Sequence, residues 1–102
     1  MTKDPQVTAA VKEILDLIKN ISPGKSVELR VPPYGAIQCV AGSNHRRGTP
    51  PNTVEMSGQT LIRLIKEPFQ WSTLCESGEV RASGLLSDLS NVLAQAAAKY
   101  RA

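Results

Sequence analysis

The sequence predicts an α+β domain, in which a mostly antiparallel sheet of about four to five strands carries helices on one face. Three observations predict this fold. Apolar residues recur at helical spacing near both ends of the chain. Segments of alternating apolar and polar residues are grouped between them. Finally, a chain of 102 residues suits one domain with a single modest core.

The first predicted element is an amphipathic helix over residues 5–20. Its apolar residues recur at helical spacing, which places them on one face, and charged residues occupy the other face. Asp4 is positioned to cap its first turn, and Pro5 occupies the first helical position, where a missing N–H has no cost. The Ser-Pro-Gly sequence at 22–24 ends it.

Three strands are expected next. Residues 26–31 alternate strictly, with Ser26 assigned to the polar face, and residues 36–41 form a second strand. The short Pro-Pro-Tyr-Gly link between them favours an antiparallel hairpin. A polar loop follows over residues 42–51, and residues 53–56 form a short third strand.

The second half should be mainly helical. We expect a helix over residues 59–67 and a second short helix over 70–77. A strand over 79–83 and a terminal helix over 85–100 complete the chain. Ser57 is a suitable N-cap for the first of these helices.

Composition excludes several classes of protein. Apolar residues make up 41% and charged residues 21%, as in globular proteins, and no apolar run approaches the ~20 residues of a membrane-spanning helix. The start MTKDPQ lacks the apolar region of a signal peptide, so a cytoplasmic protein without stable membrane insertion is expected. A net charge of +3, with aromatic residues not interleaved with basic ones, argues against nucleic acid as a partner.

The two cysteines predict neither a disulfide nor a metal site. Cys39 lies in a strand pattern and Cys75 in a helix pattern, and in a reducing compartment both are expected to be buried thiols. One histidine and two widely spaced cysteines do not have the spacing of zinc ligands. No metal or other cofactor is therefore predicted.

The segment 42–52 holds the residues whose chemistry suggests binding. It resembles a phosphate loop only superficially, because Pro50 and Pro51 prevent the helix whose amides would hold the phosphate. His45 and the two arginines after it form either an anion-binding group or a solvated loop tip. No carboxylate or oxyanion hole is recognisable beside His45, so we do not predict an enzyme.

The apolar helix faces form either a solid core or the wall of a ligand cavity. An empty lipid-sized cavity of ~300 Å³ would cost roughly 7 kcal/mol, about as much as the whole stability of a small domain. Any lipid tunnel must therefore be occupied, or must collapse when it is vacant.

Two blocks of sequence resemble sterol carrier proteins. SGQ at 57–59, followed by SGEVRASG at 77–84 and an apolar helix, is similar to the ending of those domains, and VPPYGAIQCVAG with HRRGTPPN at 45–52 is similar to small bacterial members. The resemblance spans about residues 5–97. It implies an α+β sterol-carrier-like fold whose apolar cavity holds lipid or acyl chains, with the loop arginines meeting an acidic head group.

We therefore expect a non-enzymatic protein that binds or transfers a lipid or another small amphipathic ligand. The polar contacts would come from His45, Arg47 and Asn52. The alternative is an interaction or structural domain without a cavity, which docks a protein partner weakly through the basic loop 42–52. The expected apolar wall consists of Leu64, Trp71, Leu74, Leu86, Leu89 and Leu93.

Overall fold

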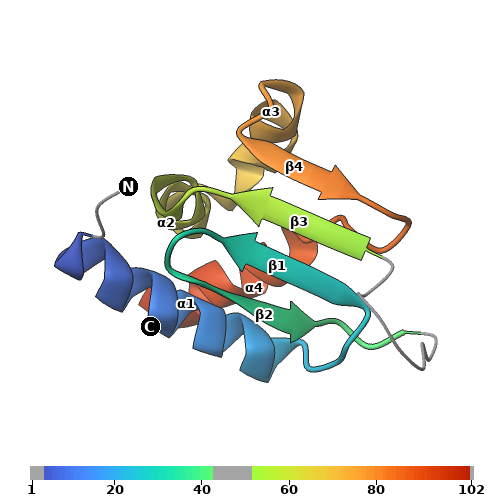
Figure 1. The fold of residues 1–102 in the computed structure, drawn as a ribbon, viewed down its shortest axis with the longest axis horizontal. Coiled ribbons are helices and arrows are strands. Elements are labelled where there is room, and N and C mark those ends of the chain that lie inside the picture. Colours follow the sequence, from blue (N-terminus) through green and yellow to red (C-terminus); the bar gives the residue numbers. More distant parts are fainter. Residues whose placement is uncertain (1–3, 43–51, 102) are drawn as a thin grey trace.

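A four-stranded sheet with the order β2-β1-β3-β4 forms the centre of the molecule (Figure 1). The computed structural model describes residues 4–42 and 52–101. β1 and β2 form the predicted antiparallel hairpin, β1 pairs with β3 in parallel, and β3 pairs with β4 antiparallel. The predicted fold class is thereby confirmed. The strands are β1 (Val27–Val31), β2 (Gly35–Cys39), β3 (Asn52–Met56) and β4 (Val80–Ser83).

The strand directions bring several chain segments to one end of the sheet. Val27 at the start of β1 pairs with Cys39 at the end of β2 and with Asn52 at the start of β3. Ser83 at the end of β4 pairs with Thr53 in the adjacent register position. We call this the loop end of the sheet, because the 42–52 connection and the segment after β4 both begin there (Figure 1).

The helices pack on one face of the sheet and leave the opposite face uncovered (Figure 1). α1, α2 and α4 contact one another, and α3 packs beside β4. Alternate residues of β1 and β3 are buried against this layer, as the period of two in a half-covered strand requires. The helical elements are α1 (Pro5–Ile21), α2 (Gly58–Lys66), the 3₁₀ turn η1 (Pro68–Gln70), α3 (Trp71–Glu76) and α4 (Ser90–Arg101).

Both predicted helix caps are confirmed. Asp4 Oδ1 accepts hydrogen bonds from the backbone N–H groups of Gln6 at 2.9 Å and Val7 at 3.4 Å. Ser57 Oγ accepts one from the N–H of Thr60 at 3.1 Å. These contacts satisfy N–H groups that have no partner inside the first helical turn, so the sequence itself fixes where α1 and α2 begin.

The terminal helix starts later than predicted. α4 begins at Ser90, and residues 85–89 are not helical. Gly84 has φ of +108°, the N–H and the hydroxyl of Ser87 both donate to the Gly84 carbonyl, and the Ser90 N–H donates to Asp88 Oδ1 at 2.9 Å. Because these local hydrogen bonds replace helical ones, the prediction of helix over 85–89 was wrong.

Among the described residues, no helix is both long enough and apolar enough to cross a membrane. α1, the longest helix with 17 residues, carries exposed charged side chains along its outer side, including Lys12 and Glu13.

Candidate ligand-binding site

Five of the six predicted wall residues lie together in the interior. They belong to one continuous apolar cluster that also contains the inward side chains of β1 and β3. The sixth, Leu86, is 42% exposed. The members of this cluster that were predicted as wall come from α2, α3, α4 and the residue just before α4, whereas Leu86 lies where the chain approaches that layer from solvent. The buried wall residues are Leu64, Trp71, Leu74, Leu89 and Leu93.

Asn52 is buried and joins three segments at the loop end. Its Nδ2 donates to the carbonyl of Ser26 at 2.8 Å, and its Oδ1 accepts from the backbone N–H of Leu86 at 3.0 Å. Ser26 is buried as well, so its assignment to the polar strand face was wrong. Because both ends of the Asn52 amide are occupied, this side chain positions the site rather than presenting free polar atoms to a ligand.

The other two predicted polar residues, His45 and Arg47, lie outside the described residues. The two ends of their segment are placed, however. Gly42 lies so close to Leu86 that an added Cβ would be 2.9 Å from Leu86 Cδ1, and Asn52 bonds to the same residue. The segment that carries His45 and Arg47 therefore leaves and re-enters the described structure beside Leu86.

The turn formed by residues 84–87 is the part of this site that sequence reasoning missed. Gly84 fits because an added Cβ would lie 2.2 Å from Asn52 Oδ1. Its neighbour Leu85 is fully exposed to solvent. The sequence did contain one signal, a glycine directly after a predicted strand, but the partner of that glycine lies 32 positions earlier in the chain, since 84 − 52 = 32.

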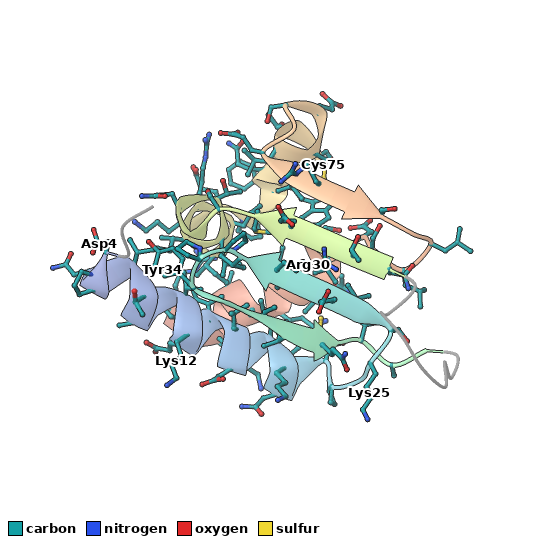
Figure 2. The ribbon with its side chains drawn as sticks, viewed as in Figure 1. Asp4, Lys12, Lys25, Arg30, Tyr34 and Cys75 are labelled. Atoms are coloured by element: carbon teal, nitrogen blue, oxygen red, sulfur yellow. The ribbon has the colours of Figure 1, made fainter. Side chains whose placement is uncertain are left out.

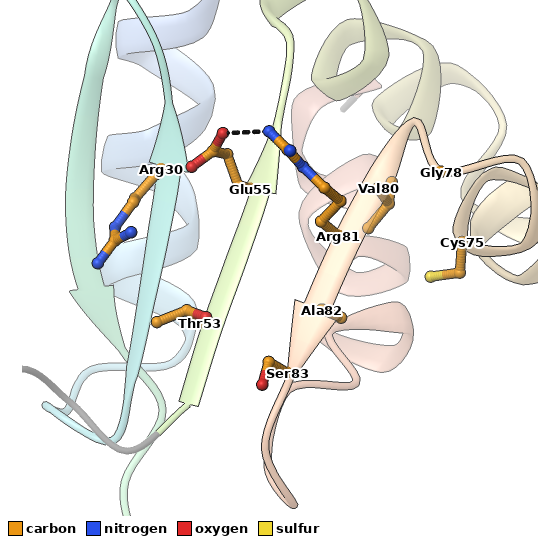
Figure 3. A pocket seen from close by; sticks show the side chains of 9 residues that line it. All are labelled: Arg30, Thr53, Glu55, Cys75, Gly78, Val80, Arg81, Ala82 and Ser83. Carbon is orange, nitrogen blue, oxygen red and sulfur yellow. Dashed lines mark hydrogen bonds and ion pairs between the residues drawn. The ribbon is translucent and has the colours of Figure 1, made fainter.

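A separate pocket of about 430 Å³ lies on the uncovered face of the sheet (Figure 3). Its floor carries Arg30, Glu55 and Arg81 on three adjacent strands, and Arg81 donates to Glu55 from the neighbouring strand. Arg30 Nε is bound to Glu28 Oε1 at 2.6 Å, so both arginines are already paired with carboxylates. Each arginine of the pocket thus has an acidic partner, and apolar residues such as Val80 and Ala82 complete the lining.

Two further shallow pockets are lined mainly by β2 and its surroundings. One, of about 480 Å³, continues across the same sheet face to Pro33 and Ala36. The other, of about 320 Å³, lies between α1 and β2 near Lys12 and Tyr34, which Figure 2 labels. None of the three pockets described here is lined by a predicted wall residue.

The cysteines are free thiols with raised pKa values. Burial raises the pKa of Cys39 from 9.0 to about 11. Burial also raises the pKa of the half-buried Cys75, and the carboxylates of Asp88 and Glu76 add to the effect. A raised pKa keeps a thiol protonated and poorly nucleophilic at neutral pH. In the described ranges, no group of three or more histidine, cysteine or acidic residues is arranged to hold a metal ion.

The fold and this apolar layer define an SCP2-like α+β domain, in which helices cover one face of a small mixed sheet. More specifically, the chain belongs to the family described as bacterial SCP ortholog, whose model matches residues 3–94. The resemblance to sterol carrier proteins is confirmed.

A solved structure titled "UbiJ-SCP2 Ubiquinone synthesis protein" is similar over the whole chain. The TM-score is 0.56 and the sequence identity 18%, and the match covers 100% of this chain and 98% of the other. At this identity the likeness establishes the fold. No curated protein matches the sequence.

Proposed function

We propose that this protein binds a lipid or another small amphipathic molecule without transforming it chemically. The observation that supports the proposal is the fall in side-chain exposure along the segment by which the chain enters the apolar layer. Within five residues the chain passes from the fully exposed Leu85, through the half-exposed Leu86, to the completely buried Leu89. An apolar tail that follows this path would meet the predicted wall on α2, α3 and α4. Membership of the bacterial SCP ortholog family supports the same function.

The apolar layer is closed in this structure, because the five interior wall residues pack within one cluster. Binding therefore has to separate side chains that already contact one another, for instance by moving α4 away from α2. Opening a space of ~300 Å³ costs roughly 7 kcal/mol, whereas each buried methylene returns about 0.8 kcal/mol. About nine methylenes are needed to offset the opening, so long acyl or prenyl chains should bind and short ones should not.

The polar end of the ligand is assigned to the segment that begins and ends beside Leu86. Arg47 supplies positive charge, and His45 a ring N–H donor, both suited to a carboxylate or phosphate head group. Asn52 contributes indirectly, by fixing the point at which this segment enters β3.

A series of fatty acids of increasing length tests the proposal. The purified protein is titrated with a fluorescent acyl probe, each fatty acid is used as a competitor, and native mass spectrometry gives the stoichiometry. Affinity should be negligible for butyrate and rise steeply once the tail exceeds about nine methylenes. Leu86→Ser should weaken binding, whereas Phe69→Ser, which alters an exposed apolar residue on η1, should not.

The absence of binding at every chain length would refute the proposal. The alternative hypothesis, a domain that docks a protein partner through residues 42–52, would then be favoured by a pull-down whose captured partner is lost on Arg46→Ala/Arg47→Ala substitution.

A further inference from the structure

β4 is an edge strand with no strand beside its outer side. In the order β2-β1-β3-β4 it pairs with β3 alone. Alternate residues of such a strand direct both their N–H and C=O groups to one side, so half of these groups on β4 face away from β3. Within residues 4–42 and 52–101, the backbone of Val80–Ser83 forms no hydrogen bond with the backbone of a turn, loop or cap. A row of free backbone donors and acceptors is complementary to another extended chain.

The same edge has an uncovered position on the side that faces the helices. Burial alternates along β1 and β3, and Val54 of β3 is completely buried. Ala82 pairs with Val54 and shares its side of the sheet, yet it is exposed, whereas Val80 two residues earlier is buried. The helical layer therefore does not extend over Ala82, and a side chain that lies beside β4 can cover it.

The pocket of about 430 Å³ continues from the open face of the sheet around this edge. Its lining includes Cys75 of α3 and Gly78 as well as all four residues of β4. Figure 3 shows the Cys75 side chain pointing from α3 towards β4. Extended peptides bind to other domains by adding a strand to an exposed sheet edge, where neighbouring pockets receive alternate side chains. The pocket provides such a space beside the free backbone groups of β4.

The α3 side of this edge favours small apolar side chains in an added strand. Cys75, Val80 and Ala82 line it with small side chains. Burial, followed by the carboxylates of Asp88 and Glu76, raises the pKa of Cys75, so negative charge already lies near this side. An acidic side chain would therefore be disfavoured here.

The opposite side of the edge favours acidic side chains, because it presents Arg81. The Arg81 side chain is 71% exposed, and its Nη2 donates to Glu55. The guanidinium has five N–H donors, which leaves some of them for a second acceptor. A carboxylate on a strand added beside β4 would lie next to Arg81, as a cross-strand neighbour does.

We infer that β4 binds an extended segment of a partner protein, which adds to the sheet as a further strand. Small apolar side chains of this segment would alternate with acidic ones. The apolar side chains would cover Ala82, and the acidic ones would contact Arg81. The inference concerns a different surface from the proposed lipid site and does not rest on lipid binding.

Synthetic peptides of about six residues, the usual length of a strand, test this inference. Valine alternates with glutamate in one peptide and with lysine in the other. Fluorescence anisotropy should show clear binding of the glutamate peptide and weaker binding of the lysine peptide. Hydrogen exchange should show new protection of amides in β4 when the glutamate peptide is bound.

N-methylation of the glutamate peptide tests whether its backbone pairs with β4. Methyl groups on one alternate set of residues remove the N–H groups that face β4 and should abolish binding. Methyl groups on the other set face away from β4 and should be tolerated. The two methylated peptides have the same side chains, so their difference reports on the backbone alone.

Arg81→Glu tests the charge on the open side. It should weaken binding of the glutamate peptide at least about fivefold, as the loss of an exposed charge pair predicts, and strengthen binding of the lysine peptide. Arg63→Glu is the matched control, because Arg63 is also exposed, pairs with Glu67 and changes the net charge equally. It should alter neither affinity. Arg81→Glu should leave fatty-acid competition unchanged, which keeps this test separate from that of the proposed function.

Several results would overturn the inference. They are failure of the glutamate peptide to bind, equal loss of binding with either methylation pattern, and equal effects of Arg81→Glu and Arg63→Glu. New protection on β2, the other edge strand, in place of β4 would also do so. A dimer of the chain alone that Ala82→Gln dissociates would show that β4 pairs with a second copy instead of a partner segment.

Discussion

Asn52 Oδ1 accepts a hydrogen bond from the backbone N–H of Leu86 at 3.0 Å, across 34 positions of sequence. Nδ2 of the same amide donates to the carbonyl oxygen of Ser26, which lies 26 positions earlier in the chain. One buried side chain therefore connects the start of β1, the start of β3 and the turn that follows β4. The position of the proposed site at the loop end depends on this connection.

Replacing Asn52 should strongly destabilise the protein. In Asn52→Ala the Ser26 carbonyl and the Leu86 N–H lose their partners, and we expect the free energy of unfolding to fall by about 2 to 4 kcal/mol. Urea denaturation measures this change. Thr53→Ala, which alters the outward face of the same strand, should cost less than about 1 kcal/mol. Similar losses in the two variants would contradict the structural role of Asn52.

Two glycines allow two costs of adding a Cβ to be measured separately: the cost of steric overlap and the cost of the backbone conformation. Gly84 and Gly78 both have positive φ, +108° and +84°, but an added Cβ meets Asn52 at Gly84 and nothing within 4 Å at Gly78. Gly78→Ala should therefore cost about 1 kcal/mol from its backbone conformation alone. Gly84→Ala should cost at least about 2 kcal/mol more, because it also displaces the Asn52 amide. Thermal and urea unfolding of both variants, compared directly, check the difference.

The proposed wall contains residues with different structural roles. Leu64 is completely buried, so Leu64→Ala should lower the free energy of unfolding by about 2 to 5 kcal/mol. Leu86→Ala should cost less than about 1.5 kcal/mol, since much of this side chain is already exposed. Denaturation gives both values, and the fatty-acid competition assay should still reveal weaker binding by Leu86→Ala. A large loss of stability in Leu86→Ala would show that Leu86 is a core residue and would contradict the smaller structural role expected for it.

The buried thiol of Cys39 should make stability fall at alkaline pH. Its pKa is raised from 9.0 to about 11 by burial, so below pH 9.0 the thiol is protonated in both the folded and the unfolded chain. Between these values the unfolded chain releases the proton and the folded protein does not. The free energy of unfolding therefore decreases there by up to about 1.4 kcal/mol per pH unit.

Comparison with Cys39→Ala isolates this effect, because all other titrating groups are shared. The difference in stability between the two proteins should be constant below about pH 9 and shrink as pH rises towards about 11. A difference that stays constant over the whole range would show that burial does not hold this thiol protonated.

Much of the secondary structure was predictable because it depends on local sequence. The caps of Asp4 and Ser57 use neighbours two or three residues away, and the period of the apolar residues in α1 and β1 identifies each element without any distant contact. The hairpin of β1 and β2 likewise needs only the short link between them. The same reasoning failed for residues 85–89, where an apolar run suited to a helix forms a turn instead.

The candidate site was only partly predictable for the same reason. Leu64, Leu74 and Leu93 were identified from helical periodicity, which selects the side of a helix that becomes buried. The roles of Asn52 and Leu85 depend on how β3 is inserted beside β1, and no local pattern contains that information. Ser26 was misassigned because its burial comes from packing at the loop end and not from its place in an alternating strand.

By itself, the sequence determined where most helices and strands lie, which of their faces are apolar, and the family to which the chain belongs. The tertiary structure alone decided that β1 and β3 run in parallel, that Asn52 joins three distant segments, and that Leu85 remains exposed. The physical reason is the range of the interactions involved. Periodicity and capping act within a few residues, whereas strand pairing and the hydrogen bonds of a buried amide join groups that only the folded chain brings together.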